Sequence, residues 1–178
     1  MTVGSSTEGT APAEGVAARV ITVSDRCAGG DREDLSGPLA ARLLAEAGLA
    51  VGPVVVVPDG IEPVRAAIGS ALDDGCRVVV TTGGTGIGPR DMTPEATAPL
   101  LSARLDGLAE AIRRRGEATA PAASLSRGLA GVTGRGPGAA LVVNAPGSPG
   151  GVRDTVAVIA PLIGHVLDQL GGGDHPAQ

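Results

Sequence analysis

The sequence of 178 residues contains no phenylalanine, tyrosine or tryptophan. Its apolar residues, 43% of the chain, must therefore build a core from Val, Leu, Ile and Ala, and the length suits one domain. Without aromatic side chains the protein lacks the platforms on which proteins stack the bases of single-stranded nucleic acids. The net charge of -5 also argues against a nucleic-acid or anionic-membrane partner.

Cysteine, histidine and long apolar runs are also scarce. Cys27 and Cys76 are too few for a disulfide scaffold, so we expect a reduced, cytoplasmic location. Two histidines and two cysteines without paired ligand spacing argue against a structural zinc site. No apolar run reaches the ~18 residues of a membrane span, so no transmembrane helix is expected. The first residues lack the basic start and apolar segment of a secretory signal.

Lysine is absent as well, because all fourteen basic residues are arginine. A P-loop requires a lysine after its last glycine, so that phosphate-binding motif is excluded. The dinucleotide fingerprint requires a third glycine three positions after the second, where this chain has Pro89 counting from Gly86. Any phosphate site in this protein must therefore be of another kind.

A glycine-rich loop is the strongest functional signal in the chain. It follows a β-branched run, Arg77–Thr81, which predicts a buried strand. Four glycines within six positions, Gly83, Gly84, Gly86 and Gly88, let the backbone approach a ligand closely. The loop runs into a predicted helix start at Thr93-Pro94-Glu95, and bare amides at a helix start suit a phosphate. Asp91 beside that phosphate suits Mg²⁺, although a glycine-rich turn without a ligand is the alternative.

Strands alternate with helices along the chain, which predicts an α/β fold with a mainly parallel sheet covered on both faces. We expect strands at 19–23, 53–57, 77–81 and 139–143, helices at 34–47, 61–74, 94–101, 105–117, 122–129 and 152–170, and flexible tails at 1–17 and 171–178. Parallel strands end at one edge, which would collect Asp25, Asp59, the 83–91 loop and the 144–151 loop. Ligands of open α/β sheets bind at that edge.

Two stretches together resemble the signatures of the MoaB/Mog family of molybdenum cofactor biosynthesis proteins. The first signature matches Thr81–Gly86 with Arg90–Glu95, and the second matches Asn144–Pro149. Ser24-Asp25-Arg26 and Asp34–Gly37 are similar to the family's first strand end and the helix start that follows it. The resemblance covers about residues 18–170 as one molybdopterin-binding domain. It implies a three-layer α/β/α sandwich, a homotrimer, and adenylylation of molybdopterin by Mg-ATP with release of pyrophosphate.

The resemblance also implies roles for individual residues. Asp91 and Asp59 would be the catalytic acidic residues and would hold Mg²⁺. Nucleotide phosphates and the pterin phosphate would be bound by Gly83, Gly84, Thr85, Gly86, Gly147, Ser148, Ser24 and Asp25. Arg90 or Arg26 could supply a further cation. The sequence departs from the family at Gly150, where relatives often carry a basic residue, so one phosphate contact could be missing.

Simpler structural roles compete with several of these assignments. Asp59 and Asp34 could each cap the helix that follows, and Asp25 could tie down its own loop. Arg113, Arg114 and Arg115 are expected to form a solvated helix face. At the level of function, a molybdopterin carrier without catalysis is the alternative to the enzyme, and a nucleotide or pyrophosphate hydrolase is a third hypothesis. A molybdenum-insertion protein would be the downstream partner.

Overall fold

A sheet of seven strands forms the centre of the computed structural model, which describes residues 14–173. The parts of the predicted tails at 1–13 and 174–178 lie outside the described residues. The strands are β1 (Ala17–Val23), β2 (Ala50–Val51), β3 (Val55–Val57), β4 (Val78–Thr82), β5 (Ala103–Arg104), β6 (Ala130–Val132) and β7 (Leu141–Ala145). They lie in the order β2-β1-β4-β7-β6-β5, and β3 also pairs with β1.

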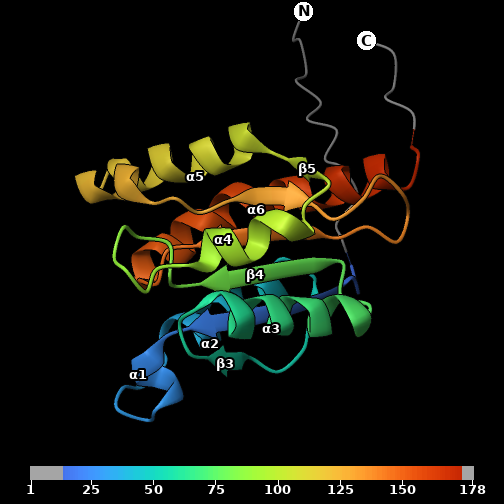
Figure 1. The fold of residues 1–178 in the computed structure, drawn as a ribbon. Coiled ribbons are helices and arrows are strands. Elements are labelled where there is room, and N and C mark those ends of the chain that lie inside the picture. Colours follow the sequence, from blue (N-terminus) through green and yellow to red (C-terminus); the bar gives the residue numbers. More distant parts are fainter. Residues whose placement is uncertain (1–13, 174–178) are drawn as a thin grey trace, which may run out of the picture.

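Helices cover both faces of this sheet (Figure 1). The helices are α1 (Asp25–Ala28), α2 (Ser36–Glu46), α3 (Ile61–Asp73), α4 (Thr93–Thr97), α5 (Asp106–Glu117) and α6 (Pro149–Leu170), with 3-10 turns η1 (Ala98–Leu100) and η2 (Pro121–Leu125). Helices α2, α5 and α6 contribute to the core cluster on one face, and α3 and α4 to the cluster on the other. The predicted α/β fold with a mainly parallel sheet and three layers is confirmed.

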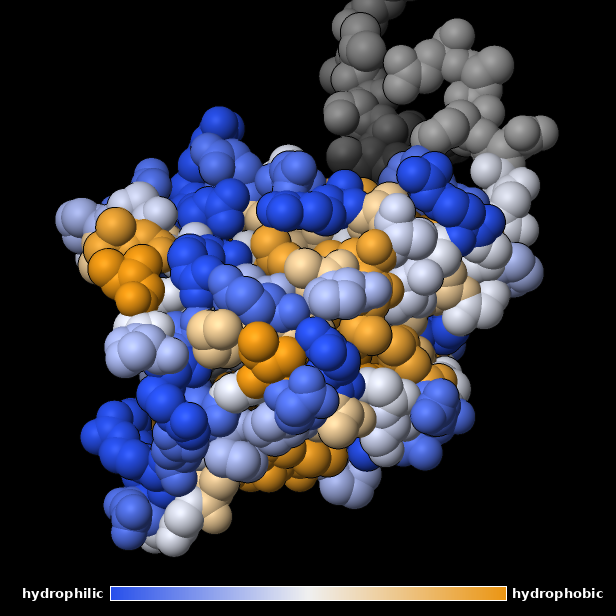
Figure 2. Space-filling view, viewed as in Figure 1, coloured by the Kyte–Doolittle hydropathy of each residue, from blue (hydrophilic) through white to orange (hydrophobic). Residues whose placement is uncertain are grey.

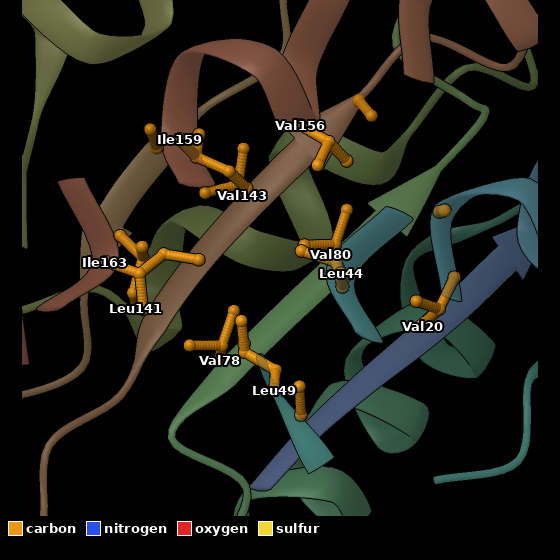
Figure 3. Close-up of a cluster of buried hydrophobic side chains, with 14 of the residues drawn as sticks. Val20, Leu44, Leu49, Val78, Val80, Leu141, Val143, Val156, Ile159 and Ile163 are labelled. Atoms are coloured by element: carbon orange, nitrogen blue, oxygen red, sulfur yellow. The ribbon is translucent and has the colours of Figure 1, made fainter. Parts of the chain in front are cut away.

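Alternate residues of the central strands supply the two core clusters. Val78 and Val80 of β4 point to the larger cluster, whereas Val79 between them points to the smaller one. Figure 3 shows the larger cluster, in which Ile159 and Ile163 of α6 lie against strand side chains such as Val143. The aliphatic side chains are fully buried, so they fill the core without any aromatic ring. In Figure 2 hydrophilic and apolar residues are interspersed over the face that carries α3 and α4.

The short strands depart most from the sequence-based expectation. Strand β2 was not predicted, and neither were β5 and β6, which make the antiparallel end of the sheet. Each has only two or three residues, too few for a hydrophobic period to show. The helix expected at 122–129 is only the turn η2, after which the chain extends into β6. Strand β1 begins at Ala17, so its first residue lies within the predicted tail.

Helix α6 is long and apolar enough to cross a membrane by length and composition. In the fold it packs against α2 and α5, and Val152, Ile159 and Ile163 are buried in the core. The helix also starts at Pro149, three residues before the predicted start. These contacts place one side of the helix in the core of the domain.

Strands β1, β3, β4 and β7 run parallel, so their carboxyl ends meet at one edge of the sheet. Strand β7 extends to Ala145, two residues beyond the predicted end, so Asn144 belongs to the strand and not to the loop. Asn144 is buried and donates to the hydroxyls of Thr81 and Thr97, each at 3.0 Å. It is therefore a structural residue that links β4, β7 and α4.

Candidate functional site

Two loops meet at the carboxyl edge of the sheet. The first is the glycine-rich loop after β4, and the second is the Pro146–Ser148 turn after β7. The Gly83 amide donates to the carbonyl of Ala145 at 3.1 Å, and the Thr82 hydroxyl donates to the carbonyl of Pro146 at 2.9 Å. The hydroxyl of Ser36, at the start of α2, donates to the Gly147 carbonyl at 2.9 Å. The predicted juxtaposition of the two signature loops is therefore present.

The first two glycines of the loop are required by its backbone. Gly83 has a φ of 106° and Gly84 a φ of 63°, in the left-handed region that other residues avoid. Thr93, the first residue of α4, holds both of them: its hydroxyl donates to the Gly83 carbonyl at 2.9 Å and its amide to the Gly84 carbonyl at 3.0 Å. Helix α4 has only five residues, and its first amide is occupied. The Thr93 amide is therefore bonded within the protein, and the expected phosphate site at the loop and the helix start stays a prediction.

Asp91 is held inside its own loop. Its Oδ2 atom accepts from the Gly88 amide at 2.8 Å, and its amide donates to the Gly88 carbonyl at 3.1 Å. A Cβ placed on Gly86 or on Gly88 would lie 2.8 Å from the same Oδ2 atom, closer than real contacts allow. The loop thus wraps the half-buried carboxylate, so the shape of the loop determines where the carboxylate lies.

Asp59 is held by neighbouring loops instead. Its Oδ2 atom accepts from the Asp25 amide at 2.8 Å, while the Asp59 amide donates to Oδ1 of Asp25 at 3.0 Å. Arg90 donates to both carboxylate oxygens of Asp25, at 3.0 and 2.8 Å, and to the Asp59 carbonyl at 3.0 Å. No side-chain bond from Asp59 caps α3, so the capping alternative for Asp59 is wrong. The hydrogen bond from Arg90 lowers the pKa of the exposed Asp25 carboxyl.

Arg127 was not identified from the sequence, yet it contacts the glycine-rich loop that carries Asp91. Its guanidinium donates to the carbonyls of Gly86 and Asp91 at 2.7 and 2.6 Å, and it forms an ion pair with Glu95 of α4. The hydrogen bond from Arg127 lowers the pKa of Glu95. Arg127 lies between η2 and β6 in a stretch without periodicity, so only contacts in the folded protein reveal it.

Three further candidates make capping contacts. The Ser24 hydroxyl accepts from the Cys27 amide at 3.2 Å and begins α1. Asp34 accepts from the amides of Ser36 and Gly37 at 3.1 and 2.9 Å, which confirms the structural alternative for this residue. The Ser148 hydroxyl accepts from the Gly151 amide at 3.1 Å as the N-cap of α6. The Ser148 side chain thereby orders the start of a 22-residue helix.

Two cavities lie on either side of the loops. The polar cavity, of about 380 Å³, is lined by carboxylates from four segments together with Gly83 and Gly84; the acidic residues in its wall are Asp25, Glu33, Asp34, Asp59 and Asp91. The apolar cavity, of about 340 Å³, is bounded by Thr85, Gly86 and Ser148 and extends between α5, η2 and α6 along Ile112, Ala123 and Leu125. Asp59 and Asp91 are thus brought into one cavity, whereas Thr85 and Ser148 face the other.

A magnesium ion fits the polar cavity only with help from a substrate. No group of three or more His, Cys, Asp or Glu side chains within residues 14–173 is placed to hold a metal. Mg²⁺ commonly uses one or two carboxylates and completes its shell with water and phosphate oxygens. Asp91 uses only its Oδ2 atom for the Gly88 amide, which leaves Oδ1 for such a role.

The three arginines of α5, residues 113–115, were expected to be solvated, but not all of them are. Arg113 lines the apolar cavity and donates to the carbonyls of Ser126 and Gly128, both at 3.4 Å. Arg114 does match the expectation, with 74% of its side chain exposed. Asp154 of α6 was not singled out from the sequence, and it lies in the wall of the same cavity, paired with Arg115 at 3.4 Å.

Comparison with known proteins places most of this chain within one protein family. The family model described as "Probable molybdopterin binding domain" matches residues 19–165. The molybdenum cofactor biosynthesis bifunctional protein of Synechococcus elongatus is 39% identical over 165 residues, which cover 90% of this chain and 49% of that protein. This chain thus spans about half the length of that relative.

Relatives of similar length also match. The molybdopterin adenylyltransferase of Pyrococcus furiosus is 40% identical over 149 residues, covering 83% of this chain and 87% of the relative. The crystal structure of a molybdopterin biosynthesis protein from Mycobacterium abscessus matches with a TM-score of 0.80 and 46% identity, over 86% of this chain and 95% of that one. Sequence and fold agree, and the chain belongs to the MoaB/Mog family of molybdenum cofactor biosynthesis proteins.

Proposed function

We propose that this protein adenylylates molybdopterin: it joins AMP from Mg-ATP to the terminal phosphate of the pterin and releases pyrophosphate. The observation that carries the proposal is the placement of Asp59 and Asp91 in one polar cavity beside the glycine-rich loop. The 40% identity to a protein named molybdopterin adenylyltransferase supports the same reaction.

The proposed reaction requires mainly that the protein position the two substrates. A phosphate oxygen of molybdopterin forms a bond to the α-phosphorus of ATP, and the bond from that phosphorus to the bridging oxygen of the β-phosphate breaks. Pyrophosphate carries away the electron pair. Because the attacking phosphate is already an anion, no strong general base is needed, and the protein contributes orientation and charge neutralisation.

The chain's own groups can bind both substrates. Amides of the loop from Gly83 to Gly86 and the Thr85 hydroxyl would hold nucleotide phosphates. Ser148 and Gly147, at the start of α6, would bind the pterin phosphate or the nucleotide, supported by the dipole of this long helix. The apolar cavity suits a flat heterocycle, which aliphatic side chains such as Ile112 and Leu125 would contact in place of aromatic rings.

Asp91 and Asp59 would hold Mg²⁺ together with substrate phosphates. The ion would offset the repulsion between the pterin phosphate and the triphosphate. Arg90 and Arg26 are cations that could bind a phosphate, because Arg90 pairs with Asp25 at an exposed position and Arg26 lines the polar cavity. Ser24 and Asp25 would act at the rim of the polar cavity, where both line the wall.

The deciding experiment incubates the purified protein with molybdopterin, ATP and Mg²⁺ and follows pterin-linked AMP and pyrophosphate. We expect AMP on the pterin, and loss of that product in Asp91→Asn while the fold survives. Asp168→Asn, in the last turn of α6, is the matched control and should keep full activity. Unchanged turnover in Asp91→Asn would refute the assignment of the site.

The same assay separates the alternatives. A carrier of molybdopterin would bind the pterin without transferring AMP, and a hydrolase would release pyrophosphate or phosphate without any pterin. The carrier is the stronger alternative, because the polar cavity holds no complete metal site among residues 14–173. Either result would refute the proposed adenylyltransferase activity in favour of that alternative.

Three further parts of the proposal concern the cell. We place the protein in the cytoplasm, since its two cysteines are not bonded to each other. We propose a homotrimer, as the family resemblance implies, to be checked by light scattering. The adenylylated product would pass to a molybdenum-insertion protein, which a co-purification with that partner would test.

A further inference from the structure

We propose that Arg127 is a positioning residue for the adenylyl transfer, and that it acts by fixing both ends of the loop that carries Asp91. This inference rests on the proposed function for its catalytic consequence, although the contacts stand independently of it. No motif assigned a role to Arg127, and it lines neither cavity.

The first step of the argument is the span of the guanidinium. Arg127 donates through Nε to the Gly86 carbonyl at 2.7 Å and through Nη2 to the Asp91 carbonyl at 2.6 Å. These two carbonyls are the two ends of the segment 86–91. A planar, bidentate donor therefore closes the segment into a ring, as a single-point donor such as lysine cannot.

The second step is the anchorage of Arg127 itself. Its amide donates to the Thr85 carbonyl at 2.9 Å, and Arg113 of α5 donates to the carbonyls on either side of it, those of Ser126 and Gly128. Glu95 of α4 pairs with the guanidinium edge that does not face Gly86. The backbone around Arg127 is thus held by α5, and its side chain is held by α4. Arg127 therefore links the loop to two helices.

The third step links the loop to the reacting groups. Inside the ring, the Gly88 amide binds the Asp91 carboxylate at 2.8 Å, and the backbone at Gly86 and Gly88 lies so close that a Cβ on either residue would be 2.8 Å from its Oδ2 atom. If the ring opens, the carboxylate loses its fixed place although it stays in the chain. Misplacement by about 1 Å can cost about 100-fold in rate, even when the altered residue lies away from the chemistry.

The test compares Arg127→Lys and Arg127→Gln with Arg114→Gln, an exposed arginine on α5, as matched control. We expect kcat to fall by about 10- to 100-fold in both Arg127 variants. The KM for ATP should change much less, because the loop amides that bind ground-state phosphates remain. The control should match the unaltered protein.

The lysine variant separates positioning from charge. If Arg127 only supplied positive charge, lysine would restore kcat, and that result would overturn the proposal. A proportional loss of activity and of melting temperature in every variant would show a merely structural role and would overturn it as well.

A second readout does not depend on turnover. Amide hydrogen exchange at Gly88 should accelerate in Arg127→Gln and stay unchanged in Arg114→Gln, since exchange reports opening of the loop. If the unaltered protein transfers no AMP, the proposed function fails while this measurement still decides whether Arg127 holds the loop. Unchanged exchange at Gly88 would refute the positioning role by itself.

Discussion

The two acidic residues of the polar cavity, Asp91 and Asp59, are held in opposite ways. Asp91 is enclosed by its own glycine loop, which Arg127 and Glu95 brace from behind. Asp59 is held by the exposed Asp25–Arg90 pair, whose side chains are 45% and 63% accessible. Enclosure gives a fixed carboxylate, whereas the exposed pair can exchange partners with a ligand. The comparison indicates that one side of the site is prearranged and the other can adapt.

The largest effect is expected from Asp91→Asn, which keeps an acceptor for the Gly88 amide but removes the charge. Adenylyl transfer should fall by about 100- to 1,000-fold, the range observed when a single electrostatic group of an active site is removed. In Asp59→Asn the rate of adenylyl transfer should fall by less, because Asp59 is held by an exposed pair that can adapt to a ligand. Quenched-flow measurement of pterin-linked AMP compares the two, and an equal loss would erase the distinction between the carboxylates.

The next effect is expected from Gly84→Ala, which tests the backbone of the glycine-rich loop before the segment that encloses Asp91. An alanine at a φ of 63° is strained, and its Cβ would also collide with the Thr93 hydroxyl. We expect a loss of about 1–3 kcal/mol in the free energy of unfolding. Gly69→Ala on α3 is the matched control, since its Cβ meets nothing within 4 Å and helix propensity favours alanine. Urea unfolding measures both; a neutral Gly84→Ala would contradict the requirement for glycine at this position of the loop.

A smaller effect is expected from Glu95→Gln, which tests the ion pair between Glu95 and Arg127 through the pH dependence of stability. The folded pKa of Glu95 is lowered below its ordinary 4.5, so the ion pair contributes its full stability above pH 4.5. That contribution is lost as the pH falls through the folded pKa. With both side chains 37% accessible, solvent screening leaves about 0.5–1 kcal/mol at neutral pH. Unfolding curves of the variant and the unaltered protein should therefore converge in acid; a constant gap would disprove the ionic origin.

The smallest effect on stability is expected from Arg90→Gln. The pair with Asp25 is exposed to solvent, which screens it. High salt should reproduce the variant, because screening is nearly complete within about 3 Å at 1 M. We expect the melting temperature to change little while the KM for ATP rises, since Arg90 is free to move to a phosphate. A large loss of stability in Arg90→Gln would show that Arg90 is a fixed part of the structure, as Arg127 is.

The sequence was sufficient for the features that depend on local pattern. The valine run of β4, the glycines with positive φ and the alternation of strands with helices predict the sheet and the edge where the loops meet. The strand ends and the glycine-rich loop also pointed to Asp59 and Asp91, which the structure places in one cavity, and the family resemblance added their catalytic roles. Their chemical roles stay predictions, since the contacts describe position and not reactivity.

The features that were missed depend on contacts between distant residues. Arg127 lies 41 positions from Gly86 and 32 from Glu95, so no local pattern marks it. The antiparallel strands β5 and β6 are too short to show a period, and their register follows from pairing with β7. Asn144 looked like a loop residue because asparagine favours turns, but three buried partners hold it in a strand.

An all-aliphatic core has a practical consequence for optical work. With no tryptophan, tyrosine or phenylalanine, the protein is almost dark in the near ultraviolet, where pterins and adenine absorb. Leu125 borders the apolar cavity and is 56% exposed, so a Leu125→Trp variant would carry the chain's one emitter at the mouth of the proposed binding site. Ligand entry could then be followed against an empty background.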